Sequence, residues 1–177
     1  QQKKAIEYKA YRGEINHDEY REAIVGLYGI SAPEQLALGK KALIDDDANV
    51  AFFEGVSETL CTLKKRGYLL AIITDTANSI SAKLSWFERG GFGHVWDAII
   101  SSMDMGVRKP DPKPYHAALS QLGLTSEQAV FVGHRTSELA GAQAVGLKTI
   151  AFNYDKDAVA DFYIENFADL LKTPVVN

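Results

Sequence analysis

The spacing of hydrophobic positions in residues 1–41 predicts helices. One apolar stripe follows the i, i+4, i+7, i+8 spacing of a helix face and consists of Tyr20, Ile24, Leu27 and Tyr28. The polar residue Asn16 precedes this stripe and is a suitable helix N-cap. Ser31 followed by Glu34 resembles a capping box and predicts the start of another helix. We therefore expect a helical front part without strands.

From about residue 56 onward, short apolar runs alternate with amphipathic segments. The runs expected to form strands cover residues 68–73, 97–101, 129–133, 148–152 and 162–164. Helical patterns cover residues 56–66, 80–89, 114–122 and 137–145, and a last helix is expected at residues 167–172. Runs that are apolar at every position are typical of strands covered on both faces. The alternation predicts an α/β fold with a doubly wound parallel sheet and helices on both faces.

Composition and charge narrow the classes of function. The chain has 19 Lys and Arg against 23 Asp and Glu, a net charge of −4 over 177 residues. This balance argues against nucleic acid or an anionic membrane as a partner, since proteins that bind them carry clustered positive charge. No apolar run approaches the roughly 20 residues of a membrane-spanning helix. The single cysteine, Cys61, fits a reducing compartment, so we expect a cytoplasmic protein.

Three polar clusters follow expected strands. They are residues 74–76, residues 106–112 and residues 133–138. In an open parallel sheet, ligands bind beyond the carboxyl ends of the strands. Hydroxyl groups, cations and acid or imidazole groups would meet there, beside helix N-termini that offer backbone donors. The combination favours a site for a phosphate or another small anion.

Three stretches of the chain carry a family resemblance. They read EGVSETLCTLKKRGYLLAIITDT, SSMDMGVRKPDPKPYHAALSQLGL and AVFVGHRTSELAGAQAVGLKTIAF. Together they resemble the core of the haloacid dehalogenase-like hydrolase superfamily, whose members are mostly phosphatases. The resemblance covers residues 53–154. It implies a core domain in residues 49–177 that lacks its first strand, preceded in residues 1–48 by part of a helical cap and a hinge.

The resemblance also implies roles for individual residues. Thr74 matches a hydroxyl that hydrogen-bonds the transferring phosphoryl group, and Lys109 matches a lysine that neutralises the phosphoryl oxygens and the nucleophile. We expect both to be catalytic, although Thr74 could instead cap the next helix and Lys109 could be a solvated surface residue. We assign Asp75, Thr76 and Arg108 to substrate binding.

The fourth motif of the family departs from its usual Gly-Asp-Ser-x-x-Asp. The same frame begins at Gly133 and places His134 at the first acid and Glu138 at the second. In the family these acids hold Mg²⁺, which prefers carboxylate and water oxygens. We therefore expect His134 to weaken Mg²⁺ binding and Glu138 to be the better metal ligand of the two. Alternatively, His134 hydrogen-bonds the backbone and Glu138 balances the dipole of the next helix.

The family's first motif, Asp-x-Asp after an apolar strand, has no counterpart ahead of the cap-like helices. Residues 45–47 are three aspartates, but too few residues separate them from the next helix for the family's turn and flap, so we expect a solvated hinge. The strand that carries this motif lies between those that end at Thr74 and Gly133 in the family. Because each unpaired buried backbone group costs about 1–3 kcal/mol, we expect upstream sequence ahead of Gln1, another chain or an unusual self-pairing to fill its place.

The favoured function is hydrolysis of a small phosphate monoester through an aspartyl-phosphate, with the nucleophile on the upstream segment. The 177 residues alone would then be inactive. One alternative is a catalytically inactive member of the fold with an interaction or structural role, and a second is a haloacid dehalogenase. The front part has a set of tyrosines, Tyr8, Tyr11, Tyr20 and Tyr28, which we expect to serve packing rather than to line an entrance.

Overall fold

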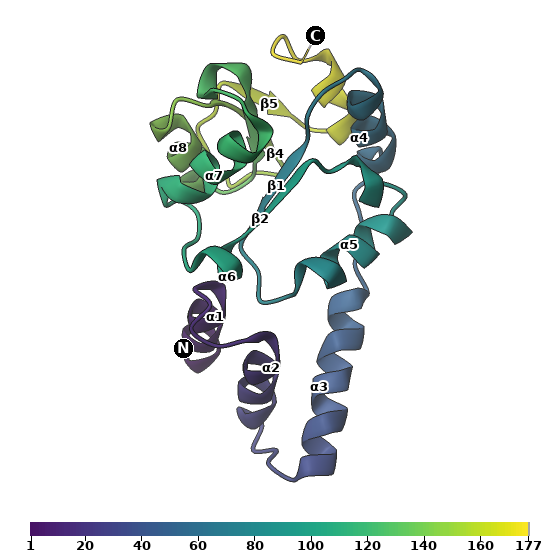
Figure 1. Cartoon of the computed structure of the whole chain (residues 1–177), viewed down its shortest axis with the longest axis vertical. Helices are drawn as coiled ribbons and strands as arrows, with labels where there is room; N and C mark the ends of the chain where they lie inside the picture. Colours follow the sequence, from purple (N-terminus) through teal and green to yellow (C-terminus); the bar gives the residue numbers. More distant parts are fainter. Residues whose placement is uncertain (177) are drawn as a thin grey trace.

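The computed structural model describes residues 1–176, in which a helical part lies below an α/β part (Figure 1). The helical part consists of α1 (Gln2–Tyr11), α2 (His17–Gly26) and α3 (Pro33–Ala48). The strands are β1 (Ala71–Thr74), β2 (Ala98–Ser101), β3 (Val130–Gly133), β4 (Lys148–Phe152) and β5 (Phe162–Ile164). The remaining helices are α4 (Val56–Lys65), α5 (Ile80–Arg89), α6 (Ser102–Met105), α7 (Pro112–Leu122) and α8 (Thr136–Ala144). Short 3-10 helices are η1 (Gly93–Val95), η2 (Ser126–Gln128) and η3 (Phe167–Lys172).

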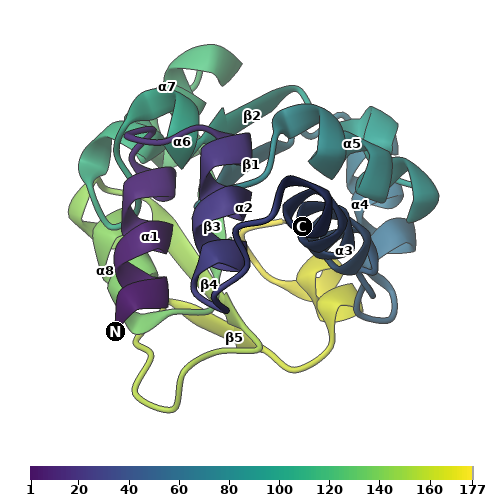
Figure 2. The ribbon, with the colours of Figure 1, turned by 90° about the horizontal axis from the view of Figure 1, so that it is seen from below.

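All five expected strands are present, and all pair in parallel. β1 pairs with β2, with Ala71 opposite Ala98, and β4 lies between β3 and β5 in a second sheet. Viewed from below, α7 and α8 lie on one side of the strands, and α4, α5 and η3 lie on the other (Figure 2). The predicted α/β class, with parallel strands and helices on both faces, is confirmed. None of the described helices is long and apolar enough to cross a membrane.

The core consists of separate clusters on the two sides of the strands. One is formed by Leu63, Ile150, Ile164, Leu170 and Val176, which join α4, β4, β5 and η3. A second, with Tyr115 and Leu119 from α7, packs against Phe131 of β3. The second cluster also includes Ile73 of β1, so α7 packs against strands of both sheets.

The helical part follows the sequence pattern only partly. The predicted N-cap Asn16 is confirmed and forms a full capping box with Glu19. The predicted stripe is wrong beyond Ile24, because α2 ends at Gly26 and Tyr28 is 80% exposed. The capping box at Ser31 is also wrong, since the N-cap of α3 is Ala32 and has no side-chain hydrogen bond.

Two other local expectations need correction. The aspartate triplet expected to be a hinge is helical, in the last turns of α3, and Asp45 forms an exposed ion pair of 2.6 Å with Lys41. Helical i, i+4 pairing of this kind explains why an acidic run continues a helix. The last expected helix is a 3-10 helix, η3, and β1 begins only at Ala71. The division into residues 1–48 and 49–177 stays a prediction.

The helical part is attached at the carboxyl ends of β1 and β2. His17 Nδ1 lies 2.8 Å from the carbonyl oxygen of Ala77, and the Arg21 guanidinium donates to Asn78 Oδ1 at 3.0 Å. Gly13, with a φ of +67°, passes against the backbone of Met103 in α6, where a side chain on residue 13 would collide with the Met103 carbonyl. α1 and α2 therefore sit over the edge where a parallel sheet binds ligands.

Candidate functional site

A gap separates the two sheets. β1 pairs only with β2 and β3 only with β4, so each has one edge without a partner strand among residues 1–176. All four residues of β1 and all four of β3 are only partly buried, whereas three of the five residues of β4 are fully buried. β1 and β3 thus have the exposure of strands that lack a neighbour on one side.

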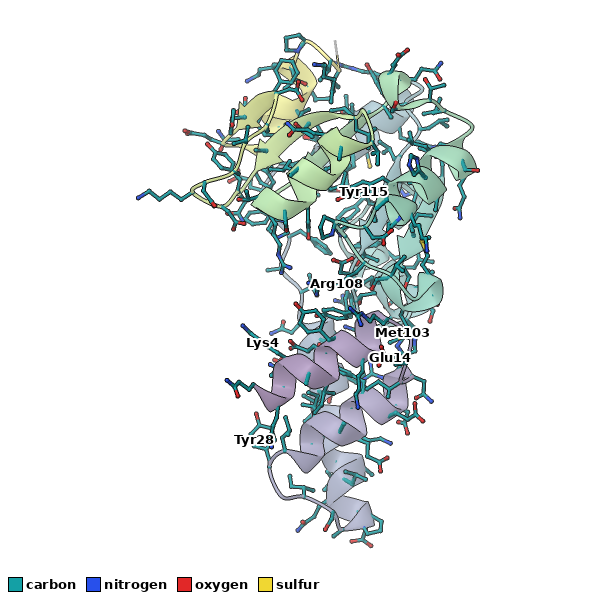
Figure 3. The ribbon with its side chains drawn as sticks, turned by 90° about the vertical axis from the view of Figure 1, so that its left-hand side faces the viewer. Lys4, Glu14, Tyr28, Met103, Arg108 and Tyr115 are labelled. Atoms are coloured by element: carbon teal, nitrogen blue, oxygen red, sulfur yellow. The ribbon has the colours of Figure 1, made fainter. Side chains whose placement is uncertain are left out.

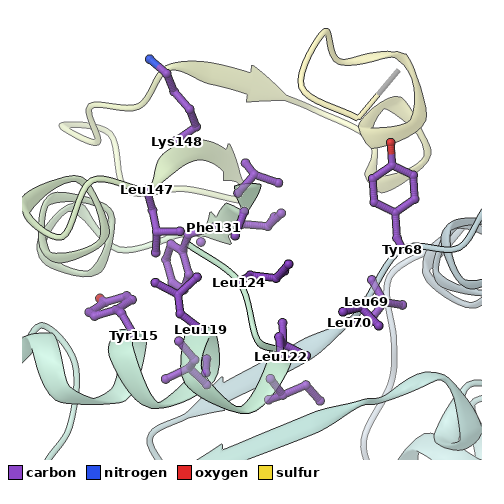
Figure 4. Close-up of a pocket in the computed structure, with 18 of the residues that line it drawn as sticks. Tyr68, Leu69, Leu70, Tyr115, Leu119, Leu122, Leu124, Phe131, Leu147 and Lys148 are labelled. Atoms are coloured by element: carbon purple, nitrogen blue, oxygen red, sulfur yellow. The ribbon is translucent and has the colours of Figure 1, made fainter. Parts of the chain in front are cut away.

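The gap is a cavity of about 1030 Å³. Every residue of β1 and of β3 lines it, and apolar side chains from α7 and the following loop, among them Leu119, Leu122 and Leu124, face it in Figure 4. Leu69 and Leu70 line the end where β1 begins. At the opposite end the lining becomes polar and consists of Asp75, Lys109, His134, Arg135 and Glu138. The cavity is therefore a largely apolar slot with charged groups at the carboxyl ends of its flanking strands, while Glu127, Gln128 and Lys148 line it near the amino ends of β3 and β4.

Lys109 is the central charge at this polar end. Its side chain is only 6% exposed, and Nζ donates to the Ile73 carbonyl oxygen at 2.9 Å. Nζ also lies 3.6 Å from Asp75 Oδ1 and 3.9 Å from Glu138 Oε1. The two carboxylates offset the cost of burying an ammonium group. The solvated surface position considered for Lys109 is therefore wrong, and the cation has a fixed place at the end of β1.

Glu138 is held in the first turn of α8, with its side chain 8% exposed. The Tyr115 hydroxyl donates to the Glu138 carbonyl oxygen at 2.8 Å. Burial, followed by the charges of Glu138 and Asp75, raises the pKa of Tyr115, so its hydroxyl remains a donor at neutral pH. Gly141, one turn later, packs directly on Pro110. α7 and α8 thereby fix the distance between Glu138 and Lys109.

The three polar residues after β1 have different surroundings. Thr74 ends β1 and lines the cavity, and Asp75 accepts a hydrogen bond of 3.2 Å from the backbone N–H of Lys109. Thr76 is buried beside Ser102, and its hydroxyl accepts from the backbone N–H of Asn78 at 2.9 Å. The structure thus brings Thr74 and Asp75 to the same site as Lys109, while Thr76 stabilises the turn that follows.

The two metal-ligand candidates lie at the cavity but differ in burial. Glu138 is buried, and His134 is exposed, with its carbonyl oxygen bonded to the backbone N–H of Asp155. Within residues 1–176, no group of three or more His, Cys, Asp and Glu side chains is arranged to hold a metal ion. Asp75 and Glu138 offer the carboxylate oxygens that Mg²⁺ prefers, but both face the ammonium group of Lys109. These side chains alone do not fit Mg²⁺; further carboxylate ligands would have to come from outside them.

The last candidate, Arg108, points away from Lys109 toward the helical part. Its guanidinium lies 4.3 Å from the centroid of the Tyr8 ring and donates to the Tyr8 hydroxyl at 3.2 Å. Figure 3 shows Arg108 at the boundary between the two parts. Tyr11, one turn after Tyr8, lines the cavity together with Lys109. Tyr11 therefore lines the site, beyond the packing role expected for it. Helical spacing alone could not show this, because it does not tell which face of α1 covers the site.

Comparisons of sequence give a family match over most of the chain. Residues 9–152 match the family described as haloacid dehalogenase-like hydrolase. Glyceraldehyde 3-phosphate phosphatase of Pyrococcus furiosus is 38% identical over 122 residues, which cover 67% of this chain and 49% of that protein. Phosphoglycolate phosphatase of Pectobacterium atrosepticum is 30% identical over 132 residues, 71% of this chain and 56% of that protein. The chain thus spans about half the length of these relatives.

Solved structures support the same architecture. A 2-haloacid dehalogenase from Pseudomonas syringae has a TM-score of 0.73 at 24% identity. The alignment covers 97% of this chain and 78% of that chain. The putative hydrolase YfnB from Bacillus subtilis, whose structure is bound to magnesium, has a TM-score of 0.71 at 20% identity, with 97% of this chain and 79% of that chain covered. At these identities the likeness is one of fold.

Proposed function

The chain belongs to the haloacid dehalogenase-like hydrolase family, and on this premise we propose that it is part of a hydrolase of small phosphate monoesters. The attacking carboxylate is carried by a β-strand that lies between β1 and β3 and comes from outside the 177 residues. The observation that carries this proposal is the buried Lys109, which lies at the carboxyl end of an open slot between two parallel strands.

The edges and the lining of the slot match what a further parallel strand requires. Neighbouring strands in a sheet lie about 4.8 Å apart, and the facing edges of β1 and β3 offer backbone donors and acceptors that have no strand partner in residues 1–176. The lining is apolar along most of its length, as required for a strand covered on both faces. A strand parallel to β1 would end beside Asp75 and Lys109, which places a side chain at its carboxyl end next to the buried cation.

The proposed chemistry uses the groups at that end. A carboxylate oxygen of the inserted strand attacks phosphorus, forming an acyl-phosphate while the P–O bond to the leaving alcohol breaks; a carboxylic acid two residues further along the same segment gives its proton to the leaving oxygen. Water then attacks the acyl-phosphate, which releases phosphate and restores the carboxylate. Lys109 neutralises the phosphoryl oxygens, and the Thr74 hydroxyl hydrogen-bonds one of them. The named relatives, a glyceraldehyde 3-phosphate phosphatase and a phosphoglycolate phosphatase, support a small phosphorylated substrate.

In this proposal, Mg²⁺ binding requires carboxylate ligands from the inserted strand. Glu138 would supply one carboxylate ligand, and the strand would supply the others, since exposed His134 is a poor ligand for this cation. When bound, the ion would supply further positive charge near the phosphoryl oxygens.

The test compares two polypeptides: the 177-residue chain and the full product of the gene that encodes it. We expect phosphate release from small phosphate monoesters by the full product and none by the 177 residues. Lys109→Ala should lower kcat of the full product by a factor on the order of 10²–10³, the scale for loss of one charge-stabilising group. Lys113→Ala removes an exposed lysine four residues away and should leave kcat unchanged.

Three outcomes would contradict the proposal. Phosphate release by the 177 residues alone would place the nucleophile inside the chain. A full product whose additional sequence has no strand ending in a carboxylate would remove the enzyme function and leave an interaction or structural role. Chloride release from a haloacid, without dependence on metal and without phosphatase activity, would instead support a dehalogenase.

A further inference from the structure

The segment that follows β1, residues 75–78, is held by side chains rather than by backbone pairing; we call it the β1 turn. Within residues 1–176, the backbone groups of residues 76–78 form no hydrogen bond with another backbone group. The core supplies two hydrogen bonds: the Thr76 N–H donates to Ser102 Oγ at 3.2 Å, and the Asn78 N–H donates to Thr76 Oγ1 at 2.9 Å. A segment without backbone pairing depends on such side-chain partners for its conformation.

Two further hydrogen bonds to the β1 turn come from α2. His17 Nδ1 lies 2.8 Å from the Ala77 carbonyl oxygen, and because a carbonyl oxygen only accepts, Nδ1 carries the hydrogen in this contact. The Arg21 guanidinium, one helical turn later on the same face of α2, donates to Asn78 Oδ1 at 3.0 Å. Figure 1 shows the segment after β1 descending toward α2. Two neighbouring residues of the turn are thus fixed by a helix that lies 60 and 57 positions earlier in the chain.

The β1 turn begins with Asp75, which holds Lys109 at two atoms. Asp75 Oδ1 accepts a hydrogen bond of 3.2 Å from the backbone N–H of Lys109 and lies 3.6 Å from its Nζ. Nζ itself donates to the carbonyl oxygen of Ile73, two residues before Asp75. Among the described residues, α2 has no hydrogen bond or ion pair with Lys109. The polar contacts therefore lead from α2 to Lys109 through the β1 turn.

We propose that His17 and Arg21 are positioning residues, which hold the β1 turn and thereby set Asp75 and Lys109 for the phosphoryl group. The inference rests on the proposed function, because it concerns the charged groups of the same site. A segment with few hydrogen bonds opens locally when its partners are removed, and a charge stabilises a transition state best when it is already in place. If the two residues only fastened the helical part, their removal would loosen α2 and leave Lys109 as it is.

The first test is amide hydrogen exchange, followed by NMR, on the full product of the gene with His17→Ala. The amides of Asn78 and Lys109 should exchange about 3- to 10-fold faster, the scale for loss of one hydrogen bond. Ile150, which is fully buried in β4, reports on the stability of the core. Its amide should exchange within about 2-fold of the original rate, since local opening leaves distant elements closed.

Arg21→Ala is the second variant and should accelerate exchange at the same two amides, so the comparison does not depend on one substitution. Glu22→Ala changes an exposed residue of α2 and is the matched control, which should leave both amides unchanged. His17→Asn keeps an N–H donor near the position of Nδ1 and should restore most of the protection lost in His17→Ala.

The second test measures kcat and KM of the full product with a small phosphate monoester. His17→Ala should lower kcat by about 10-fold, because a small displacement of a positioned group slows the reaction strongly. It should leave KM within about 3-fold, since the groups that contact the substrate are all retained. A rise in KM at unchanged kcat would mean that the helical part only covers the substrate, and would overturn the inference.

Unchanged exchange of the Asn78 and Lys109 amides in both variants also overturns the inference. Equal acceleration at Ile150 does the same, because it indicates a loss of global stability rather than a local effect on the turn. Hydrogen exchange does not use phosphate release. Local acceleration in a full product without phosphatase activity would therefore uphold the coupling of α2 to Lys109 and refute the proposed hydrolysis alone.

Discussion

Gly141→Ala tests whether α8 and the Lys109-Pro110 segment form one rigid support for the site. Gly141 lies in the middle of α8, three residues after Glu138. A Cβ atom at this position would lie 2.8 Å from the Pro110 Cβ, 2.9 Å from the Pro110 carbonyl oxygen and 3.0 Å from the Tyr115 hydroxyl. Two of these atoms belong to a proline ring and its backbone, and the third is fixed by its bond to Glu138, so none can move away cheaply.

Two opposing effects decide the sign of the change. Alanine is favoured over glycine in a helix interior by about 1 kcal/mol. Forcing an additional carbon into a packed contact costs about 1–3 kcal/mol, and the three rigid neighbours here indicate the upper half of that range. We therefore expect the free energy of unfolding to fall by about 1–2 kcal/mol. The same displacement should separate Glu138 from Lys109 and lower kcat of the full gene product.

Urea unfolding followed by circular dichroism measures the stability change. The matched control is Gly26→Ala at the end of α2, where an added Cβ meets no atom within 4 Å and the chain should be unchanged or slightly more stable. If Gly141→Ala is as stable as Gly26→Ala, the close approach of α8 to Pro110 does not exist in solution and the argument for a rigid support fails.

Three further changes test the charges and hydrogen bonds. Lys109→Met should lower the unfolding free energy by about 2–3 kcal/mol, less than the loss of one partner from a fully enclosed ion pair because the cavity is open. Adding Glu138→Gln to this variant should recover part of the loss in the same urea assay. Tyr115→Phe leaves the Glu138 carbonyl oxygen without its donor and should cost about 1 kcal/mol; an unchanged denaturation midpoint would contradict the bond. The Lys148 ammonium is the largest cause that lowers the pKa of Asp161 to about 2. The pKa of an Asp in the unfolded chain is about 3.9, so this stabilisation is present above about pH 4 and is lost as the pH falls toward 2. Asp161→Asn should therefore flatten the pH dependence of the unfolding free energy between these values. An unaltered pH dependence would refute the argument.

The sequence predicted the strands well because each is a short apolar run bounded by polar residues, a pattern that buried parallel strands require locally. The residues that follow those strands were predicted from the same logic, and Thr74, Asp75, Lys109 and Glu138 do line one cavity. Local rules failed at the two ends of α3, a helix that has no buried residue. Ser31 has the sequence of a helix cap, yet α3 begins at Pro33, and the acidic triplet continues a helix rather than forming a hinge.

By itself, then, the sequence determined the parallel α/β class and the set of polar residues at one edge of the sheet, because both follow from periodicity and from the direction of the strands. Only the tertiary structure decided which of these residues are buried and which partners each of them contacts. Burial between two carboxylates separates Lys109 from its neighbour Arg108, which lies against Tyr8, a contact between residues 100 positions apart. The structure also showed that β1 and β3, between which the family resemblance implies a further strand, each have an edge without a partner strand in residues 1–176 and that both edges line one slot. Such facts depend on contacts between distant segments, and no local pattern encodes which side of a strand or helix a distant segment will cover.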